Sequence, residues 1–337
     1  MTQKPGKVLF IQTAFPGDVV LSLAAAETLI NYYKNVQIHY VVRKGCAIFF
    51  ENHPFISKVF EFEKSKKIKS LSSTLFKIRK ENYDAVICFQ RYFSGGFLTS
   101  FSGATIKAGY LENPFSRFFD IKINYFDKSS KLPFSKHETE RCNILIRKVW
   151  NIPESYFLFP RLYPTDLKLK DLEIIQPYVV CAPGSVWFTK RLPEKKWRTL
   201  LNFIPPEYQI VLIGSREEHA LCENLIKNFL HERAINLAGK ISFMQAAAIM
   251  KNAFLCIVQD SAPLHVAGAV GAKICAIFGS TVPEFGFGPW GPQHTILEAD
   301  GPLPCRPCSI HGLKYCPQGH FKCMNNIHVE KIKSFFI

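Results

Sequence analysis

Short apolar runs and amphipathic segments alternate along the whole chain. Runs such as Val8–Gln12 and Ala85–Cys88 have the length of buried strands, and each is followed by a segment whose apolar residues recur at helical spacing. The alternation resumes at Tyr178 and continues to Phe278. Strands that alternate with helices predict an α/β fold with a parallel, doubly wound sheet in each half of the chain.

The pattern also predicts where each element lies. The expected strands are residues 8–12, 37–42, 58–62, 85–88, 105–108, 178–182, 209–213, 234–237, 253–258 and 273–278. The expected helices are residues 19–33, 46–51, 70–81, 91–100, 135–150, 194–204, 217–229, 242–251, 264–270 and 327–337.

The length of 337 residues predicts two domains, each long enough to bury its own core. A segment with three prolines, Phe159–Pro177, is the natural linker. We therefore expect a first domain over residues 1–165, a second over 166–324, and a C-terminal helix over 325–337.

Two strand ends carry an aspartate beside a turn. Gly17 permits a tight backbone path after the first strand, and Asp18 stands where the next helix begins. In the second half, Asp260 and Ser261 follow a strand, and His265 lies in the first turns of the next helix. The N–H groups at such a helix start bind phosphate, and Asp260 can accept sugar hydroxyls. The alternative is that Asp260 and Ser261 cap the helix and His265 packs beside it.

Two further strand ends favour a phosphorylated ligand. Gly184 and Ser185 form a turn that leads into a loop with Lys190 and Arg191, whose charges suit a diphosphate leaving group. A solvated basic loop is the alternative. Later, Gly214-Ser215 precedes Glu217 and Glu218, which either bind ribose hydroxyls or complement the helix dipole.

The formal net charge of +15 indicates an anionic partner such as a phosphorylated glycan or an acidic lipid surface. No zinc-finger spacing or recognition-helix pattern accompanies the charge, so nucleic acid is disfavoured; a solvated basic face is the remaining alternative. The basic residues of the first half are Lys64, Lys66, Lys67, Lys69, Lys77, Arg79, Lys80, Lys128, Lys131 and Lys136.

The sequence lacks a signal-peptide pattern at its start and has no apolar stretch of about 20 residues, so we expect a cytoplasmic protein that is peripheral on the membrane. Cysteines within apolar runs, such as Cys181 and Cys256, favour a reducing compartment. Near the end, four cysteines leave three alternatives open, namely reduced thiols, a structural zinc site or a disulfide. They are Cys305, Cys308, Cys316 and Cys323.

Taken in order, these motifs resemble glycosyltransferase family 9, the ADP-heptose:lipopolysaccharide heptosyltransferases. The resemblance covers nearly the whole chain. It rests on Gly17-Asp18-Val19, Pro183-Gly184-Ser185, Lys190-Arg191-Leu192-Pro193, Gly214-Ser215, Leu237-Ala238-Gly239-Lys240, Asp260 to His265, and Phe278 to Pro283. The chain has Ala262 where the family usually has glycine.

The resemblance implies a GT-B fold, in which two Rossmann-like domains face each other across the active-site cleft. The first domain would take the acceptor, an inner-core sugar on lipid A, with Gly17 in its binding site and Asp18 as the catalytic base. The second would take the nucleotide-sugar donor, ADP-heptose, with Lys190 on its diphosphate. The other implied donor-binding residues are Gly184, Ser185, Glu217, Glu218, Asp260, Ser261, Ala262 and His265. In GT-B proteins a C-terminal helix can cross back to the first domain.

Inverting transfer fits these residues, because it needs one base and positive stabilisation of the departing diphosphate. The sequence has no Asp-x-Asp motif, so we expect no metal and no other cofactor. Two alternatives stay open. One is a non-catalytic protein of the same fold that binds sugar nucleotides or polyanions, and the other is an epimerase that acts on a nucleotide-sugar.

Overall fold

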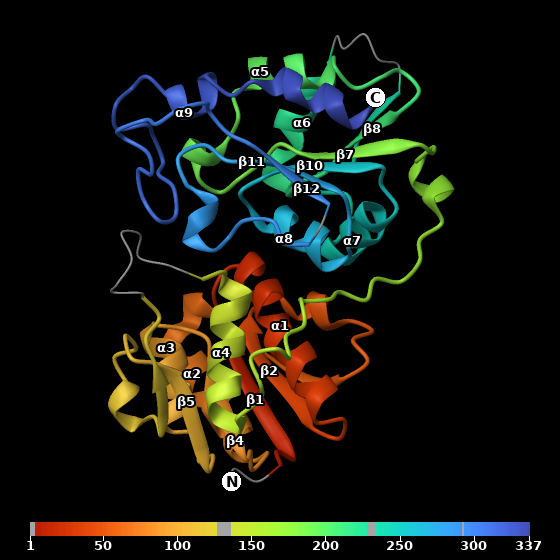
Figure 1. The fold of residues 1–337 in the computed structure, drawn as a ribbon. Coiled ribbons are helices and arrows are strands. Elements are labelled where there is room, and N and C mark those ends of the chain that lie inside the picture. Colours follow the sequence, from red (N-terminus) through yellow and green to blue (C-terminus); the bar gives the residue numbers. More distant parts are fainter. Residues whose placement is uncertain (1–3, 127–135, 228–232, 292) are drawn as a thin grey trace. The chain divides into compact units, whose positions relative to one another are not determined.

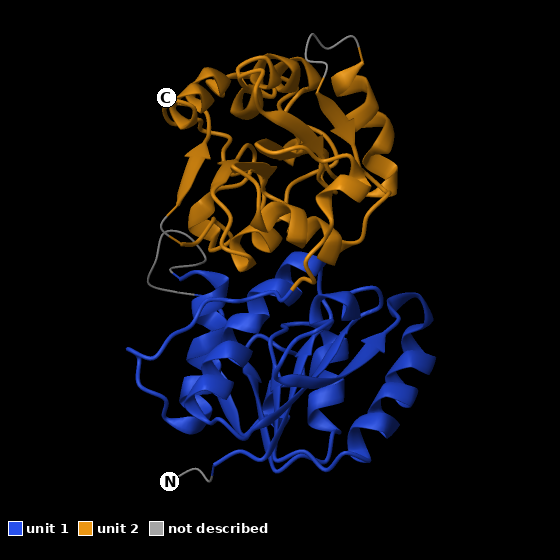
Figure 2. Cartoon of the chain, turned by 90° about the vertical axis from the view of Figure 1, so that its right-hand side faces the viewer, with its two compact units in different colours: residues 1–163 blue, residues 164–337 orange. Residues whose placement is uncertain are grey.

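The chain forms two compact units, residues 1–163 and 164–337 (Figure 2). The computed structural model describes residues 4–126, 136–227, 233–291 and 293–337. Lys128 and Lys131 of the basic cluster, and the predicted helix ends at residues 135 and 228–229, lie outside the described residues. The segment predicted as the linker begins in the first unit, where Tyr163 Oη donates to Glu27 Oε1 at 2.8 Å.

The first unit is built on a parallel sheet with strand order β3-β2-β1-β4-β5-β6 in the described residues (Figure 1). Its strands are β1 (Lys7–Gln12), β2 (Gln37–Arg43), β3 (Ile56–Phe62), β4 (Ala85–Cys88), β5 (Ile106–Tyr110) and β6 (Ile121–Ile123). Its helices are α1 (Pro16–Tyr32), α2 (Lys67–Arg79), α3 (Phe93–Ser100) and α4 (Glu138–Trp150), with 3-10 turns η1 (Ala47–Phe50), η2 (Lys64–Lys66) and η3 (Ser116–Phe118).

The second unit repeats this plan with strand order β12-β11-β10-β7-β8-β9. Its strands are β7 (Tyr178–Ala182), β8 (Gln209–Leu212), β9 (Ala234–Asn236), β10 (Leu255–Gln259), β11 (Ile274–Ile277) and β12 (His294–Leu297). Its helices are α5 (Glu194–Leu201), α6 (His219–Ile226), α7 (Phe243–Lys251), α8 (Ala262–Ala269) and α9 (Lys322–Asn325), with 3-10 turns η4 (Leu169–Leu172), η5 (Phe188–Lys190), η6 (Arg216–Glu218), η7 (Pro283–Phe285) and η8 (Val329–Phe335).

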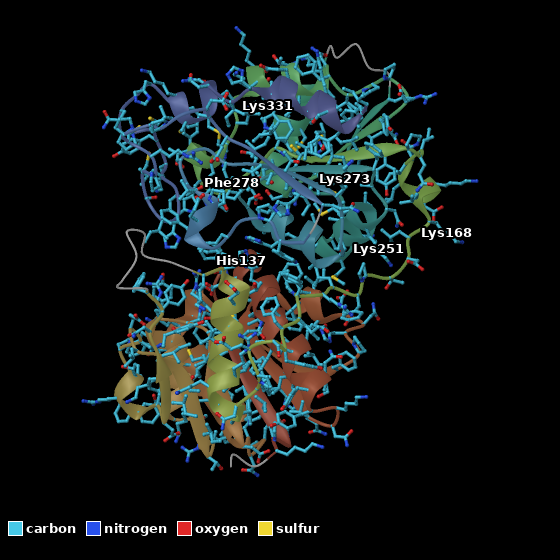
Figure 3. The ribbon with its side chains drawn as sticks, in the orientation of Figure 1. His137, Lys168, Lys251, Lys273, Phe278 and Lys331 are labelled. Carbon is cyan, nitrogen blue, oxygen red and sulfur yellow. The ribbon has the colours of Figure 1, made fainter. Side chains whose placement is uncertain are left out.

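The central strands are continuous apolar runs because helices cover both faces of a parallel sheet. Val8, Leu9, Phe10 and Ile11 are all fully buried on β1. Phe278, which directly follows β11, is fully buried in the second unit (Figure 3). The predicted α/β fold with two Rossmann-like domains is therefore confirmed.

In both sheets the side on which new strands are added changes at the first strand. The chain begins at β1 and at β7, adds strands on one side, and then returns to add β4 and β10 on the other side. The loops after β1 and β4 diverge at this point, as do those after β7 and β10, and this divergence leaves a crevice at the carboxyl ends of the strands. Each unit therefore has one topological switch point where a ligand is expected.

Several predicted elements differ in extent or type. Helix α1 begins at Pro16 rather than Val19, because proline suits the first helical position and Asp18 then falls in the first turn. The helix predicted over 46–51 is only the 3-10 turn η1. The helix predicted over 217–229 starts as the 3-10 turn η6 and continues as α6. The short edge strands β6 and β12 were not predicted.

The helix predicted over residues 327–337 is a 3-10 helix, η8. Val329 and Ile332 are three residues apart, so one face of a helix with three residues per turn buries both of them. They join Met324 and Ile327 in the core of the second unit. None of the helices in the described part of the chain has the length and apolarity that a membrane crossing requires.

Candidate active site

Three segments meet at the switch point of the second unit, and a buried glutamine ties them together. Gln259 is the last residue of β10 and is fully buried. Its Nε2 donates to the carbonyl oxygen of Pro183 in the turn after β7, and its Oε1 accepts from Leu192 N at 2.9 Å. Arg191 Nε adds a hydrogen bond of 2.6 Å to Ser185 O. The loop with Lys190 is thus fixed against two strand ends rather than free in solvent.

Lys190 and Asp260 form an ion pair with 2.6 Å between Nζ and Oδ2. The side chains are 13% and 7% exposed, so water screens the pair little. Thr281 Oγ1 donates to the same carboxylate oxygen at 2.6 Å. The sequence predicted both charged residues as donor ligands, and the structure brings them together at one strand edge.

Helix α8 starts two residues after Asp260 and thus follows this ion pair directly in the chain. Ser261 occupies the N-cap position, yet its side chain does not cap the helix; Ser261 Oγ donates to Gln259 O at 3.3 Å instead. The Asp260 carboxylate binds Lys190 and Thr281. The capping alternative for these two residues is therefore wrong, and the positive end of the helix dipole is available to an anion.

Ala262 is the first residue of α8, and His265 follows one turn later. His265 is buried, and its ring stacks on Trp290 with 5.7 Å between centroids and 10° between planes. The packing expected in the alternative interpretation is thus present for the histidine.

Glu217 and Glu218, predicted together, have different environments. Glu218 is half-buried, and its Oε2 accepts from Ser215 N at 2.8 Å in the cap of η6. Glu217 is exposed, and hydrogen bonds from its own backbone N–H and from Ser215 lower the pKa of its carboxyl. A Cβ on Gly184 would lie 1.8 Å from Glu218 Oε1, so only glycine allows this approach. The Glu218 carboxylate therefore lies beside Gly184.

In the first unit, Asp18 lies in the first turn of α1 and its Oδ2 accepts from Phe15 N at 3.2 Å. Gly17 is buried beside it. Lys64 interacts electrostatically with Asp18; burial and the nearby Arg43 lower the pKa of Lys64, and Asp18 opposes that shift. A carboxylate thus stands near two cations at the switch point of the first unit.

The model of glycosyltransferase family 9 (heptosyltransferase) matches residues 73–313, well over half of the chain. The chain belongs to glycosyltransferase family 9. Lipopolysaccharide heptosyltransferase 1 of Pseudomonas aeruginosa is 27% identical to it over 92% of this chain and 88% of that protein. As a member of this family, the protein is a glycosyltransferase.

Two solved structures share the fold. A family 9 glycosyltransferase from Veillonella parvula superposes with a TM-score of 0.77 at 19% identity, over 88% of this chain and 87% of that one. ADP-heptose lipopolysaccharide heptosyltransferase II of Escherichia coli gives a TM-score of 0.75 at 19% identity, over 97% and 99% of the two chains. This likeness supports the GT-B fold of the family 9 protein.

Three polar residues at the switch point of the second unit were not predicted as site residues, and they are Thr189, Ser280 and Thr281. Ser280 Oγ donates to Thr189 Oγ1 at 2.9 Å, and both residues are buried. Ser280 and Thr281 belong to the motif that supported the family resemblance, so their position after a strand was the available signal. Thr189 had no signal of its own, because its contacts come from a distant segment.

That segment carries the cysteine cluster and supports the Lys190 loop. Leu313 N donates to Thr189 Oγ1 at 2.7 Å, and Thr189 N donates to Leu313 O at 3.1 Å. Phe321 stacks on Phe188 with 5.4 Å between centroids. All the cysteines of the chain are free thiols in this structure.

Within the described ranges, no group of three or more His, Cys, Asp or Glu side chains is arranged to hold a metal ion. Burial, with the neighbouring cysteines, raises the pKa of the Cys308 thiol, and burial raises that of Cys323 to about 11.

Proposed function

We propose that this glycosyltransferase transfers heptose from ADP-heptose to an inner-core sugar of lipopolysaccharide, with inversion at the transferred carbon. The observation that carries the proposal is the joint position of Lys190, Asp260 and the uncapped start of α8 at one switch point. A lysine and a helix N-terminus together suit a diphosphate. The names of the relatives supply the sugar and the acceptor.

The donor binds to the second unit in this proposal. Its diphosphate contacts Lys190 and the first N–H groups of α8, and Ser185 donates a hydroxyl hydrogen bond to a phosphate oxygen. Asp260, which holds Lys190 in place in the free protein, accepts hydroxyl groups of the sugar. Glu218 lies on the Gly184 side of the same turn and is the better candidate than Glu217 for the ribose hydroxyls.

The acceptor binds to the first unit, and Asp18 acts as the general base. Its carboxylate takes the proton of the acceptor hydroxyl while that oxygen attacks the anomeric carbon of heptose. The bond between this carbon and the diphosphate oxygen breaks, and ADP leaves with the electron pair. Lys190 and the α8 dipole stabilise the growing negative charge, so the proposal needs no metal ion. The cationic surroundings of Asp18 suit a phosphorylated acceptor at the surface of the inner membrane, to which the protein would be peripheral.

Calorimetric binding of ADP-heptose, ADP, a UDP-sugar and a GDP-sugar tests the donor assignment. We expect selective binding of the two ADP compounds, weakened at least tenfold by Lys190→Ala, which removes a charged phosphate contact worth about 1.5–3 kcal/mol. Lys195→Ala, on the exposed side of α5, is the matched control. Selective binding of a UDP- or GDP-sugar would overturn the ADP-heptose assignment.

Transfer that requires a divalent cation after EDTA treatment would overturn the metal-independent mechanism.

A further inference from the structure

Five phenylalanines form one ring cluster on the surface of the first unit. Phe93 and Phe97 on α3 and Phe101 at its C-cap follow one another at four-residue intervals, so they share one side of the helix, which lies beside α2 (Figure 1). Phe115 and Phe118 join them from the segment around η3. Ring centroids are 5.1 Å apart for Phe93 and Phe115, 4.9 Å for Phe97 and Phe101, and 6.3 Å for Phe115 and Phe118. We call these five residues the phenylalanine face.

The phenylalanine face is open to solvent. Phe93, Phe101 and Phe118 are 46%, 43% and 42% exposed, and Phe97 and Phe115 are half-buried beneath them. Single exposed apolar residues are ordinary on protein surfaces, but a contiguous group of aromatic rings marks an interaction site. Because the rings already pack against one another, the surface needs no rearrangement before it meets a partner.

Cations border these rings. Lys67 Nζ lies 4.8 Å from the centre of the Phe93 ring, and the Arg117 guanidinium lies 4.6 Å from that of Phe118. Neither residue forms an ion pair within 4.0 Å among the described residues. Three acids lie within five residues of these cations in sequence. Glu63 is ion-paired with Lys44 at 3.5 Å and with Lys66 at 3.9 Å. Backbone N–H groups engage the other two: Glu112 accepts from Tyr125, and Asp120 accepts from Lys107. The rim of the face is therefore cationic.

We propose that the phenylalanine face docks on a bilayer that contains anionic phospholipid. Aromatic rings are stable at the boundary between headgroups and acyl chains, where their apolar faces leave water. Lys67 and Arg117, placed against the outermost rings, would extend their charged ends to the phosphate layer. This proposal rests on the proposed function in one respect only: a lipid-linked acceptor would require the first unit to bind at a membrane surface.

Co-sedimentation of the full chain with vesicles tests this surface. One set of vesicles is phosphatidylcholine alone, and the other contains about one-third phosphatidylglycerol to supply anionic headgroups. The variants are the triple change Phe93→Ser, Phe101→Ser and Phe118→Ser, and the double change Lys67→Glu and Arg117→Glu. Phe159→Ser is the matched control, since Phe159 is 47% exposed in the same unit but is not part of the face.

We expect the wild type and Phe159→Ser to bind the anionic vesicles, and the triple variant to bind at least tenfold more weakly. The double charge variant should lose its preference for anionic over neutral vesicles, because each cation near such a surface contributes about fivefold to binding. The single change Phe118→Ser gives a smaller loss in the same direction and serves if the triple variant does not fold. Circular dichroism and ADP binding by the second unit report folding.

The proposal is overturned if the wild type stays in solution with anionic vesicles, or if the triple variant binds them as the wild type does. It is equally overturned if the triple variant alters only the oligomeric state in gel filtration, because the face would then be a contact between proteins. Failure of the proposed function is distinguishable from these results. It would appear as absent ADP binding, or as absent transfer to a deacylated, water-soluble acceptor, and neither assay needs a membrane.

Discussion

Lys190 and Asp260 have separate roles in the proposed mechanism but depend on each other in the structure. In this structure each neutralises the other at 2.6 Å in a nearly buried position. Thr281 supplies a further hydrogen bond to the carboxylate. The lysine is therefore held at the donor edge before any ligand arrives, and the cost of orienting its flexible side chain falls on folding rather than on binding.

We expect Lys190→Met and Asp260→Asn each to lower the free energy of unfolding of the second unit by about 3–5 kcal/mol, because each leaves the other group buried without its charge partner. The double variant should lose less than the sum of the two by about 1 kcal/mol or more. Urea unfolding followed by tryptophan fluorescence measures this, since Trp197 is fully buried in that unit. Additive losses would show that the pair is not formed in solution.

Asp18→Asn should lower kcat by about 100- to 10,000-fold, the range for removal of a general base, and leave the affinity for ADP unchanged. The asparagine side chain keeps an oxygen that can accept from Phe15 N, so the helix start is retained. Asp120→Asn is the control, since Asp120 also accepts a backbone N–H in the first unit. Equal activity of the two variants in a transfer assay would remove Asp18 from the mechanism.

His39 gives the first unit a pH-dependent stability. It is buried on β2 with its Nδ1 2.8 Å from Tyr83 Oη, and burial, with the nearby Lys7, lowers its pKa to about 4. Since the unfolded chain takes up this proton near pH 6.5, the stabilisation is complete above pH 6.5 and is lost as the pH falls toward 4. The loss amounts to about 3 kcal/mol.

Chemical denaturation of the first unit between pH 7 and 4 measures this loss, and His39→Gln should flatten the profile. His294→Gln, an exposed histidine in the second unit, should not alter it. Glu81, whose pKa is lowered to about 2 by hydrogen bonds from Lys58 and Lys7, contributes mainly below about pH 4.5 and so overlaps only the acid end of this range. An unchanged slope in His39→Gln would exclude the histidine as the source.

At the scale of elements, the sequence predicted most strands and helices because parallel sheets require continuous apolar runs. It missed the edge strands β6 and β12, whose residues are mostly exposed or half-buried and include polar side chains, so neither forms a continuous apolar run. It misjudged η8, because apolar residues three apart occur in both helix types. The predicted strand ends indicated where Asp18, Gly184 and Asp260 lie, because the parallel strands of one sheet all end at the same edge of that sheet.

Other features of the donor edge depend on contacts that no local pattern contains. The pairing of Lys190 with Asp260 joins segments 70 residues apart in sequence. The support of Thr189 by Leu313 spans 124 positions. Such contacts follow from the order of strands in the sheet, which the sequence pattern alone did not specify.

The turn after β7 and the cap of η6 act as one structural element, because Gly184 has no side chain. Gly184→Ala would place a methyl group at the position of Glu218 Oε1 and displace that carboxylate from Ser215 N. We expect a loss of about 1 kcal/mol in unfolding free energy, the usual cost of a lost cap, and weaker ADP binding. In a Glu218→Ala background the same glycine change should cost much less. Equal costs in the two backgrounds, measured by urea unfolding, would contradict this coupling.

For the whole molecule, cysteine accessibility offers a test of the complete fold. Eight of the eleven cysteines are buried, whereas Cys305, Cys308 and Cys316 are partly exposed. Burial raises the pKa of interior thiols such as Cys46 and Cys88 to about 11, and a protonated thiol reacts slowly. Titration with a disulfide reagent should therefore modify about three thiols in the native protein and all of them in denaturant. Fast reaction of seven or more native thiols would contradict the packing of both cores.

Residues 323–332, near the end of the chain, complete the core of the second unit, and this order affects folding during synthesis. Strands β1 to β6 and helix α4 of the first unit all precede residue 164 in the chain, so the first unit has what it needs to fold before the second unit is complete. The second unit keeps apolar strands exposed until Met324, Ile327 and Ile332 have been synthesised. A premature stop codon near the end of the message would therefore yield a polypeptide with an intact first unit and an unfinished second one. Chaperones and proteases would recognise such a product by its exposed sheet.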